Sequence, residues 1–441
     1  KGNTKTRDKV LRREMEIEEG QLFSETRLED SKRRINALGY FERVDVSTEQ
    51  GSAPDRININ FEVGERPTGT FQVGAGFSSV ENFIATAQIQ QANLFGNGQS
   101  LALQAQVSGL RQLVSLRFFE PYFLDSDWST SAELFSQLYV FPDFSRTSRG
   151  GSLTFGYALI QPWLRISLTG TAQDDTVDTQ SSTFFGAGGG FVSVFQRLPL
   201  ANLFNSGRTI SLRPAIVYDT RDNRLFPTSG IFLQASSELA SSYMGSEIEF
   251  LRHRFTGRFY YPLGGQTGAP GSGFVLKLNT ELGLITSPHA EGVPIFARFF
   301  LGGILDVRGY RLRTVGPRLP LNQSLDVNSS PIANGANIGG NLQAYSNLEF
   351  EFPIIDKVGI RGVGFFDAGN AWLEGQTLNP FKMRASAGLE LRVFLPIFQA
   401  PLRFIYGVNL DPKTILGVDG TPLTGAKEKR SDFQFSIGTT F

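Results

Sequence analysis

The sequence contains no cysteine, and its 441 residues include only two histidines, His253 and His289. Because cysteine is absent, the chain has no disulfide framework, no thiol nucleophile and no thiolate metal site, although this absence fits any cellular compartment. Neither histidine has a serine and a carboxylate at a spacing typical of a catalytic triad. The pattern therefore disfavours a hydrolase.

Net charge and long apolar runs are missing as well. The 42 basic residues balance the 42 acidic residues, so the chain lacks the basic footprint of a nucleic-acid-binding protein. No stretch supplies the roughly 18 uncharged apolar residues that a membrane helix needs. The chain opens on Lys1 without a basic or apolar leader, so a secretion signal is absent or already removed, and the sequence is consistent with a fragment.

Glycine and phenylalanine are abundant, with 48 and 39 copies. In a chain with few long apolar runs, this mixture predicts many strands that are joined by tight turns. A length of 441 residues also allows more than one domain. The composition therefore favours a mainly β protein.

The first 66 residues differ from the rest, because helical signals dominate there. Ser24 is a candidate helix cap, and the apolar positions Leu28, Ile35 and Leu38 form a stripe that stops at Gly39, a typical C-terminal signal. Two alternating runs follow, "RVDVSTE" and "RININFEVGE", which indicate strands. In the second run we expect Ile57, Ile59, Phe61 and Val63 to share one face. The predicted order is helix, helix, strand, strand.

Beyond Pro67 the helical period almost disappears, and long segments alternate between apolar and polar residues. In "LKLNTELGLI", Leu276, Leu278, Leu282 and Leu284 face one way, opposite Lys277, Asn279 and Glu281. "SLALQAQVSG" and "SDFQFSIGTTF" follow the same rule. A sandwich would bury both faces, whereas these segments suit a sheet with lipid on one side and water on the other. The pattern predicts a transmembrane β-barrel.

The number of such segments indicates sixteen antiparallel strands, an even number in the usual range for outer-membrane barrels. The connections after even strands are short, and the two longest, roughly 175–205 and 287–339, both follow odd strands, as this topology requires. A closed barrel also satisfies every backbone group without water. We predict strands that start near 69, 82, 99, 112, 128, 146, 163, 206, 230, 247, 273, 340, 357, 382, 401 and 431.

Two short motifs superficially suggest ligand sites. "GAGGGF" at 186–191 resembles a phosphate loop, but it lacks the strand-to-helix setting and the lysine. "DDTVD" at 174–178 offers acidic side chains that could hold calcium, yet a solvated loop is the simpler reading. We expect no metal site in the chain.

The second long connection contains "DVRGYR", with Val307, Arg308, Gly309 and Tyr310. These residues resemble the VRGF/Y motif in the sixth extracellular loop of the BamA-type outer-membrane insertases, a family with chloroplast and mitochondrial relatives. Other segments are similar to family stretches in the same order. They are "GYFERVDV", "INFEVGERP", "QQANLFGNGQSL", "FFEPYF", "YDTRDNRLFPTSGIFL", "SNLEFEFP" and "GFFDAGNAW".

The resemblance implies that the loop folds into the barrel and that Arg308 meets acidic residues on the inner wall. These map to Glu349 in "NLEFEF" and Asp367 in "GFFDAGN", whose neighbours we expect to face lipid. Arginine can bind both carboxylates with its planar fork, which lysine lacks. Gly309 would allow a sharp turn, and Tyr310 offers a ring with a polar tip. The alternatives are a solvated loop arginine and carboxylates that only tune lumen charge.

The two ends of the barrel also carry family features. The carboxyl end resembles the β-signal, with alternating residues that include Phe433, Phe435, Gly438 and the terminal Phe441, although every barrel client has a similar end. The first strand, about 69–78, contains glycines that lower its pairing stability. A seam between the first and last strands is therefore plausible. The glycines are Gly69, Gly74 and Gly76.

The resemblance implies a partial periplasmic POTRA domain at 1–66 and a sixteen-stranded outer-membrane barrel at 67–441, from a Gram-negative bacterium. Such a protein folds and inserts other β-barrels, with unfolded barrel clients, periplasmic assembly lipoproteins and outer-membrane lipid as partners and with no nucleic acid. It would act by strand templating at the seam, not as an enzyme, and would need no cofactor. The alternatives are a two-partner-secretion transporter and a passive porin or lumen enzyme.

Overall fold

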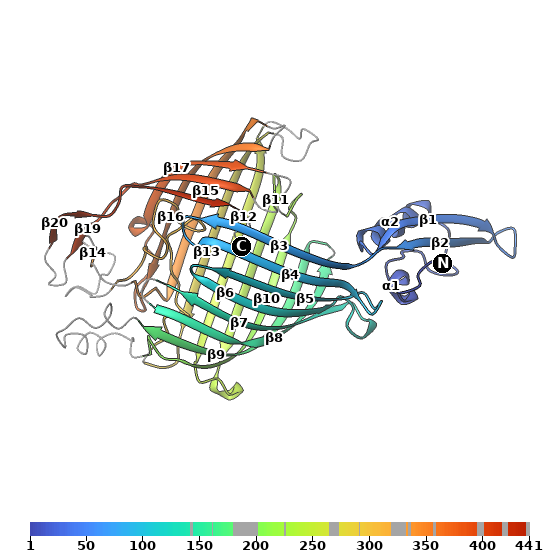
Figure 1. Cartoon of the computed structure of the whole chain (residues 1–441), viewed down its shortest axis with the longest axis horizontal. Helices are drawn as coiled ribbons and strands as arrows, with labels where there is room; N and C mark the ends of the chain where they lie inside the picture. Colours follow the sequence, from blue (N-terminus) through green and yellow to red (C-terminus); the bar gives the residue numbers. More distant parts are fainter. Residues whose placement is uncertain are drawn as a thin grey trace.

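The computed structural model shows a β-barrel with a small domain attached at one end of its strands (Figure 1). No helix in the described part of the chain is long and apolar enough to cross a membrane. The structure describes residues 1–441 except 142–143, 161, 180–201, 225, 264–272, 291, 319–331, 334–336, 356–358, 395–400, 417–421 and 438–441.

Sixteen antiparallel strands close the barrel, which confirms the predicted fold class. Each strand pairs with its neighbour along the chain, and the first strand, β3, meets the last, β21. The strands are β3 (Gly69–Ser78), β4 (Asn82–Leu94), β5 (Gln99–Ser108), β6 (Arg111–Glu120), β7 (Trp128–Val140), β8 (Phe144–Ile160), β9 (Leu164–Thr179), β10 (Gly207–Asp219), β11 (Gly230–Ala240), β12 (Phe250–Leu263), β13 (Phe274–Thr286), β15 (Leu342–Ile355), β16 (Ile360–Trp372), β17 (Arg384–Val393), β18 (Leu402–Asn409) and β21 (Ser431–Ile437).

The alternation of side chains explains why these segments form a barrel wall. On β13, Leu278 and Leu282 remain 38% and 41% exposed on the outer face, while Lys277 and Glu281 point inward and form ion pairs. An apolar outer face and a polar lumen are what a membrane barrel requires. The predicted starts of all sixteen strands lie within three residues of the observed ones.

The predicted start of one loop, near residue 175, is wrong. The acidic run 174–178 does not lie in a solvated loop, because β9 continues to Thr179. Asp175 is 2% exposed and pairs with Arg146 at 2.8 Å. The strand thus accommodates this acidic run, with Asp175 buried in the lumen and Asp174 exposed on the other face. The glycine run at 186–191 lies outside the described residues.

The amino-terminal domain, residues 1–66, has the predicted order. Helices α1 (Asp8–Arg12) and α2 (Glu25–Ala37) precede strands β1 (Phe41–Gln50) and β2 (Ile57–Glu65), which form an antiparallel pair. The Ser24 hydroxyl caps α2, and Gly39 follows it with a left-handed φ of 73°. Val63 is buried as predicted, but Ile57 is 50% exposed at the start of β2.

The domain docks on the first two turns at its end of the barrel. The Tyr40 hydroxyl donates to the Gly98 carbonyl at 3.3 Å, and Asn93 donates to the Thr6 hydroxyl at 2.8 Å. The Arg13 guanidinium lies 4.3 Å from the centre of the Tyr122 ring. These contacts involve the turns after β4 and β6, so they fix the domain beside the first strands of the barrel (Figure 1).

A small sheet at the opposite end of the barrel was not predicted (Figure 1). Its strands are β14 (Ile332–Ala333), β19 (Thr414–Leu416) and β20 (Pro422–Lys427). Strand β14 lies in the connection after β13, whereas β19 and β20 lie in the connection after β18. The parallel pairing of β14 with β19 therefore joins two connections that are far apart in sequence. Strands this short carry no clear period, which explains why the sequence did not reveal them.

We predict that acid weakens the docking of residues 4–6 on β2. Burial alone would raise the pKa of Glu65, but hydrogen bonds donated by Thr6, Lys5 and Thr4 outweigh it and lower the pKa from 4.5 to about 2. The carboxylate therefore stabilises the folded segment fully above pH 4.5 and loses this effect as the pH falls toward 2. Hydrogen exchange at residues 4–6, corrected for intrinsic rates, should show protection that declines in acid.

Glu62, which is exposed on the same strand, provides the matched control. Glu65→Gln should lower protection of residues 4–6 at neutral pH and remove its pH dependence, because the neutral amide is a weaker acceptor. Glu62→Gln should leave both unchanged. Equal protection at pH 5 and pH 2 in the unmodified protein would contradict the prediction.

Candidate functional site

The connection between β13 and β15, residues 287–341 and here called loop 6, places its motif against the inner wall of the barrel. Val307, Arg308 and Tyr310 are 0%, 1% and 4% exposed. Gly309 has a φ of 82°, a left-handed conformation that glycine adopts without strain. The motif is therefore buried, and the alternative of a solvated loop arginine is excluded.

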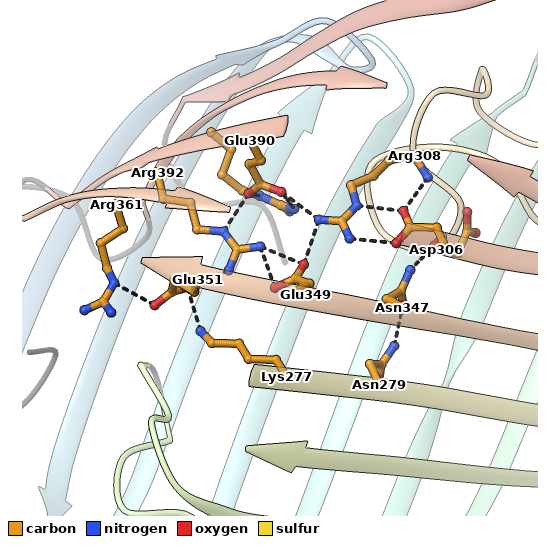
Figure 2. A network of polar contacts seen from close by, with 12 residues as sticks. Lys277, Asn279, Asp306, Arg308, Asn347, Glu349, Glu351, Arg361, Glu390 and Arg392 are labelled. Atoms are coloured by element: carbon orange, nitrogen blue, oxygen red, sulfur yellow. Dashed lines mark hydrogen bonds and ion pairs between the residues drawn. The ribbon is translucent and has the colours of Figure 1, made fainter. Parts of the chain in front are cut away.

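Arg308 lies among three carboxylates from three consecutive strands (Figure 2). Its Nε and one terminal nitrogen donate to the two oxygens of Asp367 on β16, each at 2.7 Å. The other terminal nitrogen donates to Glu349 on β15 at 2.7 Å and to Glu390 on β17 at 2.8 Å. The structure thus brings Arg308 together with Glu349 and Asp367 and adds Glu390, which sequence reasoning missed.

Phe365 corrects one detail of the expected geometry. We expected both phenylalanines before Asp367 to face lipid, but only Phe366 does, at 45% exposed. Phe365 is two residues from Asp367 and shares its inward face, where it is 5% exposed. The Arg308 guanidinium lies 3.9 Å from the centre of its ring. The cation therefore combines ion pairs with an aromatic contact.

The carboxylates around Arg308 belong to a larger ion network. Arg392 donates to Glu349, Glu351 and Glu390, at 2.7 to 3.0 Å. Figure 2 shows Arg392 between Glu390 on one side and Glu349 and Glu351 on the other, with Arg361 and Lys277 beside Glu351. The described network holds four carboxylates and five cations, so one positive charge is in excess. They are Glu349, Glu351, Asp367 and Glu390 with Lys277, Arg308, Arg361, Arg392 and Arg403.

A sequence signal for the missed residues does exist. Glu349 and Glu351 are two positions apart, as are Glu390 and Arg392, so each pair lies on one face of its strand. The observed register then sets the strands side by side, with Glu349 opposite Phe365 on β16. Alternation alone predicts that these charges face the lumen. It does not predict which charges meet, because that depends on the stagger of adjacent strands.

Gly309 and Tyr310 extend the contacts of the motif toward the end of the chain. A β-carbon at Gly407 on β18 would lie 2.5 Å from the α-carbon of Gly309, so the two backbones touch. The Tyr310 hydroxyl donates to Asn409 on β18 at 2.7 Å and to the Ala385 carbonyl on β17 at 3.2 Å. A side chain larger than glycine at either backbone contact would push the loop off the wall.

A cavity of about 640 Å³ lies beside the network inside the barrel. Arg308, Glu349 and Arg392 line one part of it, and Phe226 and Pro227, from the turn after β10, line another. The lumen is therefore not filled by side chains. Within the described residues, no group of three or more His, Cys, Asp or Glu is arranged to hold a metal ion.

The seam between β3 and β21 lies beside the wall that holds the motif. Over the described residues, Ser78 pairs with Ser436 and Phe77 with Ile437. The rings of Phe77 and Phe435 stack with their centres 5.6 Å apart. First and last strands thus meet directly and close the barrel.

The residues predicted for the seam occupy both strands. Gly69, Gly74 and Gly76 lie on β3, where they pair with β4, and a β-carbon at Gly74 would come within 2.7 Å of the Thr86 hydroxyl. Phe433 on β21 is 57% exposed on the outer face. The other two residues of the terminal signal, Gly438 and Phe441, lie outside the described residues.

We predict that Arg308→Ala strongly destabilises the barrel. The substitution leaves the buried Asp367 without its cation, a change that costs about 3–5 kcal/mol of unfolding free energy. Arg308→Lys should recover only part of this loss, because an ammonium cannot bind Asp367 with two parallel hydrogen bonds. The temperature at which the folded barrel loses its resistance to detergent measures the effect.

The matched control is Arg117→Ala, which removes an arginine that is 60% exposed and pairs with Glu133 at 2.9 Å on neighbouring strands. Exposed pairs contribute about 1 kcal/mol or less, so this variant should unfold close to the unmodified protein. If Arg308→Ala and Arg117→Ala unfold at the same temperature, the motif does not hold loop 6 to the wall.

Two family models match the chain. Residues 93–441 match the Omp85 superfamily domain, and residues 1–66 match a POTRA model described as a surface antigen variable number repeat. The first match spans the barrel from the turn after β4 to the end, and the second spans the amino-terminal domain.

Relatives with assigned roles match over the whole chain. The outer membrane protein assembly factor BamA of Nitratidesulfovibrio vulgaris is 29% identical, over 100% of this chain and 50% of its own length. BamA of Neisseria meningitidis is 26% identical, over 100% of this chain and 56% of its own. The chain therefore spans about half the length of the curated bacterial relatives it matches.

Solved structures agree on the fold. BamA from Haemophilus ducreyi lacking POTRA domains 1–3 superposes with a TM-score of 0.77 at 23% identity, over 100% of this chain and 83% of that one. CdiB from Escherichia coli gives a TM-score of 0.56 at 13% identity, over 99% of this chain and 74% of that one. Because the barrel carries the superfamily model over most of the sequence, the chain belongs to the Omp85 superfamily.

Proposed function

We propose that this chain is the barrel, with the adjoining POTRA domain, of a protein that folds and inserts β-barrel proteins into the outer membrane of a Gram-negative bacterium. The match to BamA assembly factors over the entire chain supports this function most directly. The POTRA domain would lie in the periplasm, and the apolar outer face of the barrel would contact lipid. The alternative is export of one partner protein, and the distant likeness to CdiB, which concerns the fold alone, does not favour it.

The seam between β3 and β21 is the proposed place of action. If the two strands separate, β3 exposes a row of unpaired N–H and C=O groups, and a client strand can add to this edge. Backbone groups in lipid need such partners, so the edge would template each client strand until the client barrel closes. Burial of the client's apolar surface in lipid provides the free energy, so the mechanism needs neither a nucleotide nor a catalytic residue.

The POTRA domain would bring clients and accessory proteins to this edge. Its β1 and β2 form a two-stranded sheet, and periplasmic lipoproteins or unfolded clients could pair with an open strand edge there. The docking contacts on the turns after β4 and β6 hold the domain beside the first strands of the barrel. Material delivered by the domain would thus arrive near β3.

A disulfide across the seam tests this function. The chain has no cysteine, so Ser78→Cys with Ser436→Cys introduces a single pair at register partners. In cells depleted of the native protein, this variant should support assembly of other outer-membrane barrels only under reducing conditions. Levels of heat-modifiable barrels in the outer membrane provide the measurement, and the cross-linked protein should lose most of its activity.

The control places a disulfide between two strands far from the seam. Thr154 on β8 and Thr169 on β9 are register partners whose hydroxyls lie 2.9 Å apart. Thr154→Cys with Thr169→Cys should cross-link without affecting assembly. The proposal fails if barrel assembly continues normally with the seam locked, or if depletion of the protein leaves other barrels unaffected.

A further inference from the structure

Loop 6 contacts the last strand directly, in addition to the wall that holds Arg308. Gln434 on β21 is 3% exposed, and its side-chain nitrogen donates to the Tyr310 carbonyl at 2.9 Å. The same nitrogen donates to Asp432 at 3.2 Å. The motif therefore spans the inner wall from β15 to β21, and its last contact lies on the strand that forms the seam.

The position of the Tyr310 carbonyl is fixed, because loop 6 is anchored to the barrel both before and after this residue. On one side, the ion pairs of Arg308 and the Tyr310 hydroxyl bind β15, β16, β17 and β18. On the other side, the Arg313 guanidinium lies 3.8 Å from the ring centre of Phe141 and 3.3 Å from that of Phe300. Phe141 directly follows β7, which is eight strands from β16 around the barrel. Residues 308–313 of loop 6 thus cross the lumen, and this segment is here called the strut.

Gln434 and the seam residue Ser436 are two positions apart, so both point into the lumen. Gln434 pairs in register with Ile405 on β18, and Ser436 pairs with Ser78 on β3. Residues 434–436 of β21 therefore contact loop 6, β18 and β3. A displacement of the Gln434 backbone therefore also displaces Ser436, which pairs with β3.

We propose that Gln434 is a positioning residue that ties the last strand to loop 6, so that the docking of loop 6 controls how often the seam opens. While Tyr310 is held on the wall, the hydrogen bond keeps β21 in register with β3. When the loop is displaced, the buried amide loses one of its two acceptors and the strand separates more readily. The inference rests on the proposed function only in treating seam opening as the working step.

Labelling of a buried seam cysteine measures this coupling without any client. Ser436 is 0% exposed, so in the purified protein in lipid vesicles Ser436→Cys should react with a water-soluble maleimide only when the seam opens. Addition of Gln434→Met, which keeps the length of the side chain but removes the donor, should raise the labelling rate about two- to tenfold, the range expected when the closed state loses one net hydrogen bond. Arg308→Lys should raise the rate as well, because it loosens the strut.

Two controls separate positioning from general stability. Gln106 on β5 is 6% exposed in the lumen and distant from loop 6 in the strand order, so Gln106→Met should leave the rate unchanged. The labelling rate of Thr169→Cys, which is 6% exposed on β9, should not respond to Gln434→Met. If Gln434→Met does not fold, Gln434→Ala removes the donor without adding bulk or charge.

An unchanged or slower labelling rate in the folded Gln434 variant overturns the coupling, even if the protein still inserts clients. Conversely, faster labelling in a protein whose locked seam leaves client assembly intact supports the coupling and overturns the proposed function. The two proposals therefore fail on different measurements.

Discussion

A guanidinium that is 1% exposed needs compensating charge at the place where it lies, and this requirement shapes the inner wall of the barrel. Arg308 meets carboxylates on β15, β16 and β17, and each of these carboxylates except Asp367 has a further cation beside it. Removal of Arg308 would leave Asp367 without a cation among the described ion pairs, and would leave Glu349 and Glu390 with fewer. The stability of Arg308 in the lumen therefore depends on the whole network, because the charge of each ion is compensated by several others.

The network also determines the path of loop 6. Gly309 must remain small because its backbone touches that of Gly407, and the turn at Gly309 directs Tyr310 toward Asn409. A long loop loses considerable conformational entropy when it is ordered, and one surface ion pair could not offset this loss. Several buried contacts along one wall, together with the aromatic contacts of Arg313 near the opposite wall, account for an ordered motif within a loop of this length.

Periodicity carried most of the fold prediction, because the outer face meets lipid and the inner face meets water on nearly every strand. The same rule failed where charge was mistaken for a loop, as at Asp175, whose partner Arg146 lies on a neighbouring strand. Resemblance supplied Arg308, Glu349 and Asp367. Neither source supplied Glu390, because contacts between strands depend on register, which local sequence does not encode.

The two strands of the seam differ in their contacts with loop 6. Loop 6 contacts the strands from β15 to β21 through the motif, whereas β3 has no motif contact among the described hydrogen bonds and ion pairs. One side of the seam is thus braced from within the lumen and the other depends on its strand neighbours, β4 and β21. When the barrel opens, β3 is therefore the strand with more freedom to move, and its glycines make that edge easier to bend toward an incoming strand.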